Sequence, residues 1–188
     1  MMDSNASGAV AVALVGALLS GHCSHLEELN LYSSFEDEES VRFVLQSVKN
    51  LCLPGLRRFE WGNLKVNQDY SILLGEALKA GAFPKLENLR FFEQSVHHSL
   101  WEALEAGSCP EVKDLGLEKV LLDSGSSTAL ASAIASGALR KLQHLYFHNS
   151  VDGYEGTSLA EVLTAVASSC PDLRHLGLCG GFRNPATR

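Results

Sequence analysis

Leu86-Glu-Asn-Leu89-Arg-Phe91 and Leu142-Gln-His-Leu145-Tyr-Phe147 share one pattern, in which apolar residues stand at the first, fourth and sixth positions. The pattern occurs six times, and its first positions are separated by 30, 30, 26, 30 and 31 residues. Such regular self-similarity indicates a repeat architecture, in which each unit must stack on its neighbours to bury its apolar face. The six segments begin at Leu26, Leu56, Leu86, Val112, Leu142 and Leu173.

The residues between the segments predict one helix in each unit. Apolar residues recur there at three- and four-residue steps, which is the spacing of one helix face. Glycine follows four of these stretches and proline precedes four of the segments, so the helix ends in a left-handed residue and does not continue. The expected helices cover residues 9–20, 38–50, 70–80, 100–106, 128–136 and 159–168.

Two of these helices carry a start signal. Ser99 with Glu102, and Ser158 with Glu161, match the capping box, in which the two side chains satisfy free amides at the start of a helix. Each unit is therefore expected to run from strand to turn to helix. We expect a single α/β domain over residues 1–188, with residues 1–20 as the helix of the first repeat and residues 182–188 as a C-terminal tail.

Cysteines and large aromatic residues occupy positions that we expect to be buried. Three residues before its segment, every unit has Cys, Leu or Phe, so the cysteines at this position act as small apolar residues. The fourth and sixth segment positions point into the core of a strand-and-helix stack. The side chains expected in the core are Cys23, Cys109, Cys170, Phe59, Trp61, Phe91 and Phe147.

These units resemble the leucine-rich repeat, whose consensus begins L-x-x-L-x-L, over roughly residues 9–181. The long helical segment is similar to the ribonuclease-inhibitor-like class, and Cys109-Pro-Glu-Val112 and Cys170-Pro-Asp-Leu173 are similar to the cysteine-containing class. Eight residues after the first leucine, where the family usually has Asn or Cys, this chain has other residues in all six units. The resemblance implies a curved solenoid of about six repeats, with parallel strands on the concave face and helices on the convex face. It also implies a non-enzymatic module or scaffold that binds a protein partner through the concave face.

Three positions of each unit are expected to face solvent on that concave face: the third, the fifth, and the one after the last apolar residue. Equivalent positions of neighbouring parallel strands form lateral rows about 4.8 Å apart per step. Tyr32 and Phe92 near Arg58 and Arg90 are residue types that dominate binding energy at interfaces, although a solvated face with scattered aromatics is an equal alternative. The candidate partner-binding residues are Glu28, Asn30, Tyr32, Arg58, Glu60, Asn88, Arg90, Phe92, Asp114, Glu118, His144, Tyr146, His148 and His175.

Two rows contain residue types that bind zinc, so a metal-binding, histidine-rich surface is an alternative function. Structural zinc sites usually draw their ligands from closer sequence spacings than the roughly 30 residues that separate these side chains, so a metal is the less favoured interpretation. A flat, open strand face also has no pocket to hold catalytic groups in place, which argues against an enzyme. The chain has no P-loop, dinucleotide fingerprint, G-x-S-x-G or H-E-x-x-H motif, and no cofactor is expected. The two sets of neighbours are Asp114, His144 and His175, and Glu118, His148 and Cys179.

The net charge and the cysteine content limit the classes of partner and the cellular compartment that we expect. Fifteen basic and 22 acidic residues give a net charge of −7, which disfavours nucleic acid. Five cysteines without a C-x-x-C pair indicate a reducing, cytoplasmic location. The longest apolar run, residues 8–19, is too short to span a bilayer. Because no separate cap is visible, the ends favour self-association, a structural role in a larger assembly, or a place within a longer repeat array.

Overall fold

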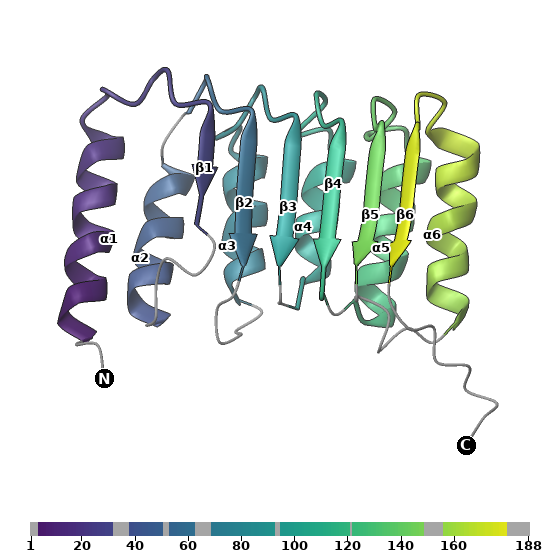
Figure 1. Cartoon of the computed structure of the whole chain (residues 1–188), viewed down its shortest axis with the longest axis horizontal. Coiled ribbons are helices and arrows are strands. Elements are labelled where there is room, and N and C mark those ends of the chain that lie inside the picture. Colours follow the sequence, from purple (N-terminus) through teal and green to yellow (C-terminus); the bar gives the residue numbers. More distant parts are fainter. Residues whose placement is uncertain are drawn as a thin grey trace.

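A computed structural model of the chain describes residues 4–31, 38–50, 53–62, 69–92, 95–120, 122–148 and 156–179. In these residues six helices alternate with six strands (Figure 1). The helices are α1 (Ser4–Leu19), α2 (Glu38–Lys49), α3 (Asp69–Lys79), α4 (His98–Glu105), α5 (Ser124–Ala135) and α6 (Gly156–Ser169). The strands are β1 (Glu28–Asn30), β2 (Arg58–Gly62), β3 (Asn88–Phe92), β4 (Asp114–Glu118), β5 (His144–His148) and β6 (His175–Cys179).

The six strands form one parallel sheet in the order β1-β2-β3-β4-β5-β6. Figure 1 shows the helices in a row behind one face of this sheet, with α1 and α6 at the two ends of the row. The fourth segment positions are aligned from strand to strand, which confirms the predicted α/β architecture and register. The aligned residues are Leu29, Phe59, Leu89, Leu115, Leu145 and Leu176.

The core lies between the sheet and the helices, as predicted from the inward strand positions. Phe59 and Phe91 are fully buried. The ring of Phe59 stacks on that of Phe83 with centroids 5.4 Å apart, and the ring of Phe91 meets Trp101 edge-on at 6.1 Å. Such aromatic pairs stabilise a core beyond their buried area. Trp61, Phe147, Cys109 and Cys170 are also buried as expected, whereas Cys23 is only partly buried.

Glycine ends the helices as predicted. Gly81 follows α3 with a φ of +76°, the left-handed conformation in which a side chain is strained. Its amide donates to the Leu78 carbonyl at 2.9 Å, and the Ala82 amide donates to the Ala77 carbonyl at 3.1 Å. These two bonds form a Schellman motif, which satisfies carbonyls that the helix leaves open. Glycines with the same left-handed backbone follow three other helices at positions 21, 107 and 137.

The helix starts were predicted less well than the helix ends. The capping box at Ser99 is wrong, because α4 begins at His98, two residues before the expected start, and its N-cap is His97, with a ring nitrogen that accepts from the Ser99 amide. Ser158 likewise lies inside α6 instead of before it. Helix α5 begins at Ser124, four residues before the expected start, because Asp123 caps it by accepting from the Ser126 amide at 2.7 Å.

Helix α1 differs from the others in its surface. Between Ser4 and Ser20 it has no charged residue, and Val10, Val12 and Leu19 are exposed. A helix that is apolar on all sides is usually covered by other protein or by lipid. Among the described residues, no helix is both long enough and apolar enough to cross a membrane.

Candidate functional site: the open strand face

The side of the sheet that the helices leave uncovered carries the candidate residues, and we call it the open strand face. Each strand places its outward residues between two inward ones, as in Asn88-Leu89-Arg90, where only the leucine is fully buried. Tyr32 lies outside the described residues. The other candidates lie on the strands and in the lateral register that the repeat predicts. They are Glu28, Asn30, Arg58, Glu60, Asn88, Arg90, Phe92, Asp114, Glu118, His144, Tyr146, His148 and His175.

The row nearest the start of the strands is joined by polar contacts between neighbouring strands. Arg58 Nη1 donates to Glu28 Oε1 at 2.9 Å. Asn88 Nδ2 donates to Asp114 Oδ2 at 3.0 Å, and a hydrogen bond joins the other carboxylate oxygen of Asp114 to Nδ1 of His144. These side chains are therefore held in place by residues 26 to 30 positions away in the sequence.

The histidines of this row stack instead of converging on a point. The ring of His144 lies over that of His175 with centroids 5.0 Å apart and over that of Tyr146 at 6.2 Å. Across the open face, His148 Nδ1 lies 3.6 Å from Glu118 Oε1. Within the described ranges, no three His, Cys, Asp or Glu side chains are placed to hold a metal ion. The geometry therefore gives no support to the metal-binding alternative.

Two glycines on the open strand face make room for large side chains of the preceding strand. A Cβ added to Gly116 would lie 3.0 Å from Cγ of Arg90, and one added to Gly177 would lie 2.6 Å from the ring of Tyr146. Each of these side chains therefore leans across its neighbouring strand. Gly62 instead lies against the backbone of Phe92, which a Cβ at this glycine would overlap.

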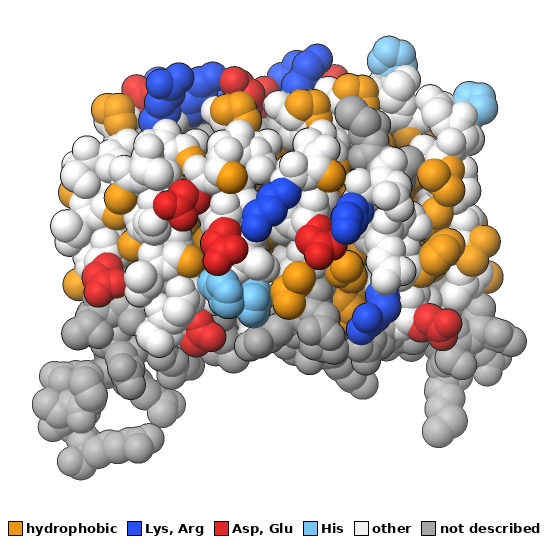
Figure 2. Space-filling model, turned by 180° about the vertical axis from the view of Figure 1, so that it is seen from behind, with side chains coloured by type: hydrophobic (Ala, Val, Ile, Leu, Met, Phe, Trp, Pro, Cys, Tyr) orange, Lys and Arg blue, Asp and Glu red, His pale blue; other side chains and the backbone are white. Residues whose placement is uncertain are grey.

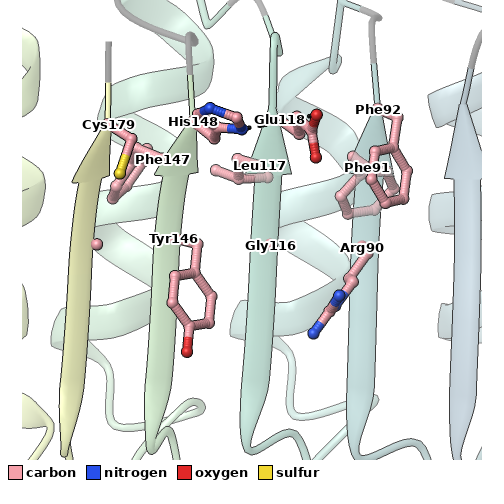
Figure 3. Close-up of a pocket in the computed structure, with 11 residues that line it drawn as sticks. Arg90, Phe91, Phe92, Gly116, Leu117, Glu118, Tyr146, Phe147, His148 and Cys179 are labelled. Atoms are coloured by element: carbon pink, nitrogen blue, oxygen red, sulfur yellow. Dashed lines mark ion pairs between the residues drawn. The ribbon is translucent and has the colours of Figure 1, made fainter.

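A hollow of about 320 Å³ lies on the open strand face over β3, β4, β5 and β6. Figure 3 shows Arg90 and Tyr146 on either side of Gly116, while Glu118 and His148 lie together toward the ends of the strands. Tyr146 is an exposed aromatic, at 38% of its full accessibility. The hollow exists because strand position five alternates between large residues and glycine in this half of the sheet, from Arg90 to Gly177.

A charged rim where the strands begin was not predicted from the sequence. Glu87 accepts from Arg57 at 2.8 Å and from Lys113 at 2.9 Å. The hydrogen bond from Lys113 outweighs partial burial and, with the charge of Arg57, holds the pKa of Glu87 below its ordinary value. Lys141 donates to Glu111 at 2.6 Å in the same region. Figure 2 shows charged side chains of both signs along this edge.

The charged rim could have been predicted from the residues at the second position of the repeated segments. Arg57, Glu87 and Lys113 follow the first apolar residue of three successive units, and their alternating charges become neighbours once the strands are parallel. Exposed ion pairs of this kind contribute little each, so their main effect is to fix long side chains along the edge.

Neither the comparison with protein-family models nor the comparison with curated proteins finds a match for this chain.

Proposed function

We propose that this chain is a leucine-rich repeat solenoid that works as a non-enzymatic interaction module and binds a protein partner through the open strand face. The observation that carries the proposal is the hollow, at whose sides Arg90 and Tyr146 stand with their polar ends unbonded to any described residue. Arginine and tyrosine are among the residue types that contribute most to binding energy in interfaces.

The contacts around the hollow support the same function. Arg58, Asn88 and His144 are each hydrogen-bonded to a carboxylate on a neighbouring strand. A surface whose side chains are already ordered loses less conformational entropy when a partner binds. The open strand face thus combines a pre-ordered surround with two anchoring side chains that have bonding capacity left.

A partner captured from cells provides the test. The tagged chain and an Arg90→Ala/Tyr146→Ala variant would be compared by affinity purification with mass spectrometry, followed by calorimetry with the purified partner. Phe43→Ala/Lys49→Ala is the matched control, because it removes one exposed aromatic and one cation from the helix side. We expect the partner to be lost only from the first variant. Equal binding by both variants, with unchanged circular dichroism, would contradict the proposal.

The free cysteines support a cytoplasmic location. Cys23, Cys109, Cys170 and Cys179 are free thiols, as expected for a reducing compartment. Burial raises the pKa of Cys109 to about 12 and raises that of Cys170 as well. Neither buried thiol is therefore a ready nucleophile at neutral pH.

A structural role in a larger assembly is a second candidate, and the surface of α1 favours it. Val10, Tyr70 and Ser126 stand sixteen residues before the first positions of their segments. Tyr70 and Ser126 are 3% and 1% exposed, whereas Val10 is 55% exposed. On the edge strand β6, at the opposite end of the sheet from α1, Leu176 is 43% exposed, although the leucines aligned with it on the other strands are buried.

Each of these exposed positions is one that a neighbouring unit covers elsewhere in the molecule. The structural role therefore predicts that another subunit, or further repeat units, cover them. Light scattering over a range of protein concentrations tests this for a second copy of the chain. The mass should rise with concentration and fall to that of a monomer in Val10→Lys/Leu176→Lys, while a constant monomer mass for the unaltered chain would count against self-association.

A further inference from the structure

Arg90 differs from Arg57 and Arg58, the arginines at the neighbouring strand β2, because its charge is not neutralised by a described residue. Arg58 bonds to Glu28 at 2.9 Å, and Arg57 bonds to Glu87 at 2.8 Å. Arg90 makes no hydrogen bond or ion pair with any residue in the described part of the chain, although it is partly buried. Its nearest acidic counterpart in the register, Glu60, already accepts from Asn30 at 2.6 Å. A partly buried guanidinium gains most from an anion that reaches it from outside.

The position of Arg90 is set by the neighbouring strand. Its stem lies across Gly116, where a Cβ would come within 3.0 Å of Cγ. The ring of Tyr146 stands on the other side of Gly116, and Figure 3 shows the guanidinium and the hydroxyl at the same end of the two side chains. The Tyr146 hydroxyl, too, has no hydrogen-bond partner among the described residues. Two unused donors therefore line one hollow.

The remaining walls of the hollow are mostly apolar or already paired. Glu118 and His148 lie 3.6 Å apart at the other end of the hollow. The ring faces of Phe92 and Tyr146 supply apolar surface. A guanidinium beside a hydroxyl suits the two oxygens of a carboxylate, because arginine donates two parallel hydrogen bonds. The volume of about 320 Å³ is at the small end of the range for ligand sites.

We propose that this hollow receives an acidic side chain of the protein partner, Asp or Glu, together with an apolar side chain next to it. The carboxylate is bound by Arg90 and the Tyr146 hydroxyl, and the apolar group packs against the rings of Tyr146 and Phe92. This inference rests on the proposed function, since it names the chemistry that the open strand face recognises.

Nuclear magnetic resonance titration with 3-phenylpropionate tests the site without a known partner, because this probe joins a carboxylate to one apolar ring. The neutral 3-phenylpropionamide has the same shape and is the matched control ligand. We expect saturable shifts at the amides of Gly116 and Gly177 and at Nε of Arg90. The acid should bind at least tenfold more tightly than the amide, with a dissociation constant on the order of 1 mM, as for other weak small ligands.

Three variants locate the binding. Arg90→Gln should remove the preference for the acid, while Arg58→Gln, which alters an arginine already paired on the same face, should keep it. Gly116→Ala should weaken binding several-fold, because its methyl group displaces the stem of Arg90. The inference is overturned by equal affinity for acid and amide, by an unchanged preference in Arg90→Gln, or by no saturable shift up to about 10 mM.

The two proposals fail in different ways. If the partner is lost from Arg90→Ala/Tyr146→Ala but the acid shows no preference, the open strand face binds a partner of other chemistry and only this inference is wrong. If the partner binds that variant as well as the unaltered chain, the proposed function itself is wrong.

Discussion

Replacing Gly81 by alanine isolates the conformational cost of ending a helix in this repeat. Gly81 has a φ of +76°, and a Cβ added to it meets no heavy atom within 4 Å. Steric overlap therefore contributes nothing, and the cost comes from the left-handed backbone alone, about 1–2 kcal/mol for a residue with a side chain. Alanine also restricts the unfolded chain, which offsets about 0.4–1 kcal/mol. We expect Gly81→Ala to lower the free energy of unfolding by about 1 kcal/mol.

Urea unfolding followed by far-ultraviolet circular dichroism measures this change. With a slope of about 2 kcal/mol per molar urea, the midpoint should fall by about 0.5 M while the slope stays the same. Gly81→Asn should lose less, because asparagine adopts the left-handed conformation more readily.

Gly125→Ala is the matched control for the same chemical change. Gly125 lies in the first turn of α5 without a left-handed φ, and its Cβ would lie 3.5 Å from Asp123 Oδ1, an ordinary contact. Alanine is the better helix former, so this variant should be more stable by about 0.5 kcal/mol. Shifts of the same sign in both variants, or no shift in Gly81→Ala, would refute the reasoning.

Three further predictions concern the core, a helix start and a thiol. Leu115 is fully buried at the centre of the sheet, so Leu115→Ala should lower the free energy of unfolding by about 2–5 kcal/mol; a loss below about 1 kcal/mol in urea would contradict its place in the core. The Asp123 carboxylate accepts from the Ser126 amide, and that hydrogen bond lowers the pKa of Asp123. The stabilisation of the folded state by this cap is therefore present above the ordinary pKa of aspartate and is lost as the pH falls through the lowered pKa. Asp123→Ala should therefore cost about 1 kcal/mol at neutral pH and nothing in strong acid, and equal costs at both pH values in thermal unfolding would oppose this assignment. Burial raises the pKa of Cys109 to about 12, whereas Cys179 is exposed. Iodoacetamide at neutral pH should therefore label Cys179 before Cys109, as measured by peptide mass spectrometry. Faster labelling of Cys109 would show that the fold around it opens.

Much of the fold follows from the spacing of apolar residues. A period of about 30 residues with apolar side chains at the first, fourth and sixth positions leaves parallel stacking as the arrangement that buries every unit, and the alignment of Leu89 with Leu115 confirms it. The glycine stop at Gly81 was equally predictable, because only a residue without a side chain takes that backbone easily. Helix starts were not, because serine and histidine side chains choose between several amides within one turn, as at His97 and Ser99.

The sequence alone determined which residues share the open strand face, since strand alternation and a constant repeat length decide both the side of the sheet and the lateral row. Only the tertiary structure decided which way those side chains point and which neighbours they contact. Arg90 leans across Gly116, and His144 stacks on His175 instead of joining it around a metal. Each of these outcomes depends on the side chain or the empty space that the next strand presents about 30 residues away. A row can be read from spacing, but the direction of each side chain within it depends on packing against neighbours that only the assembled sheet brings together.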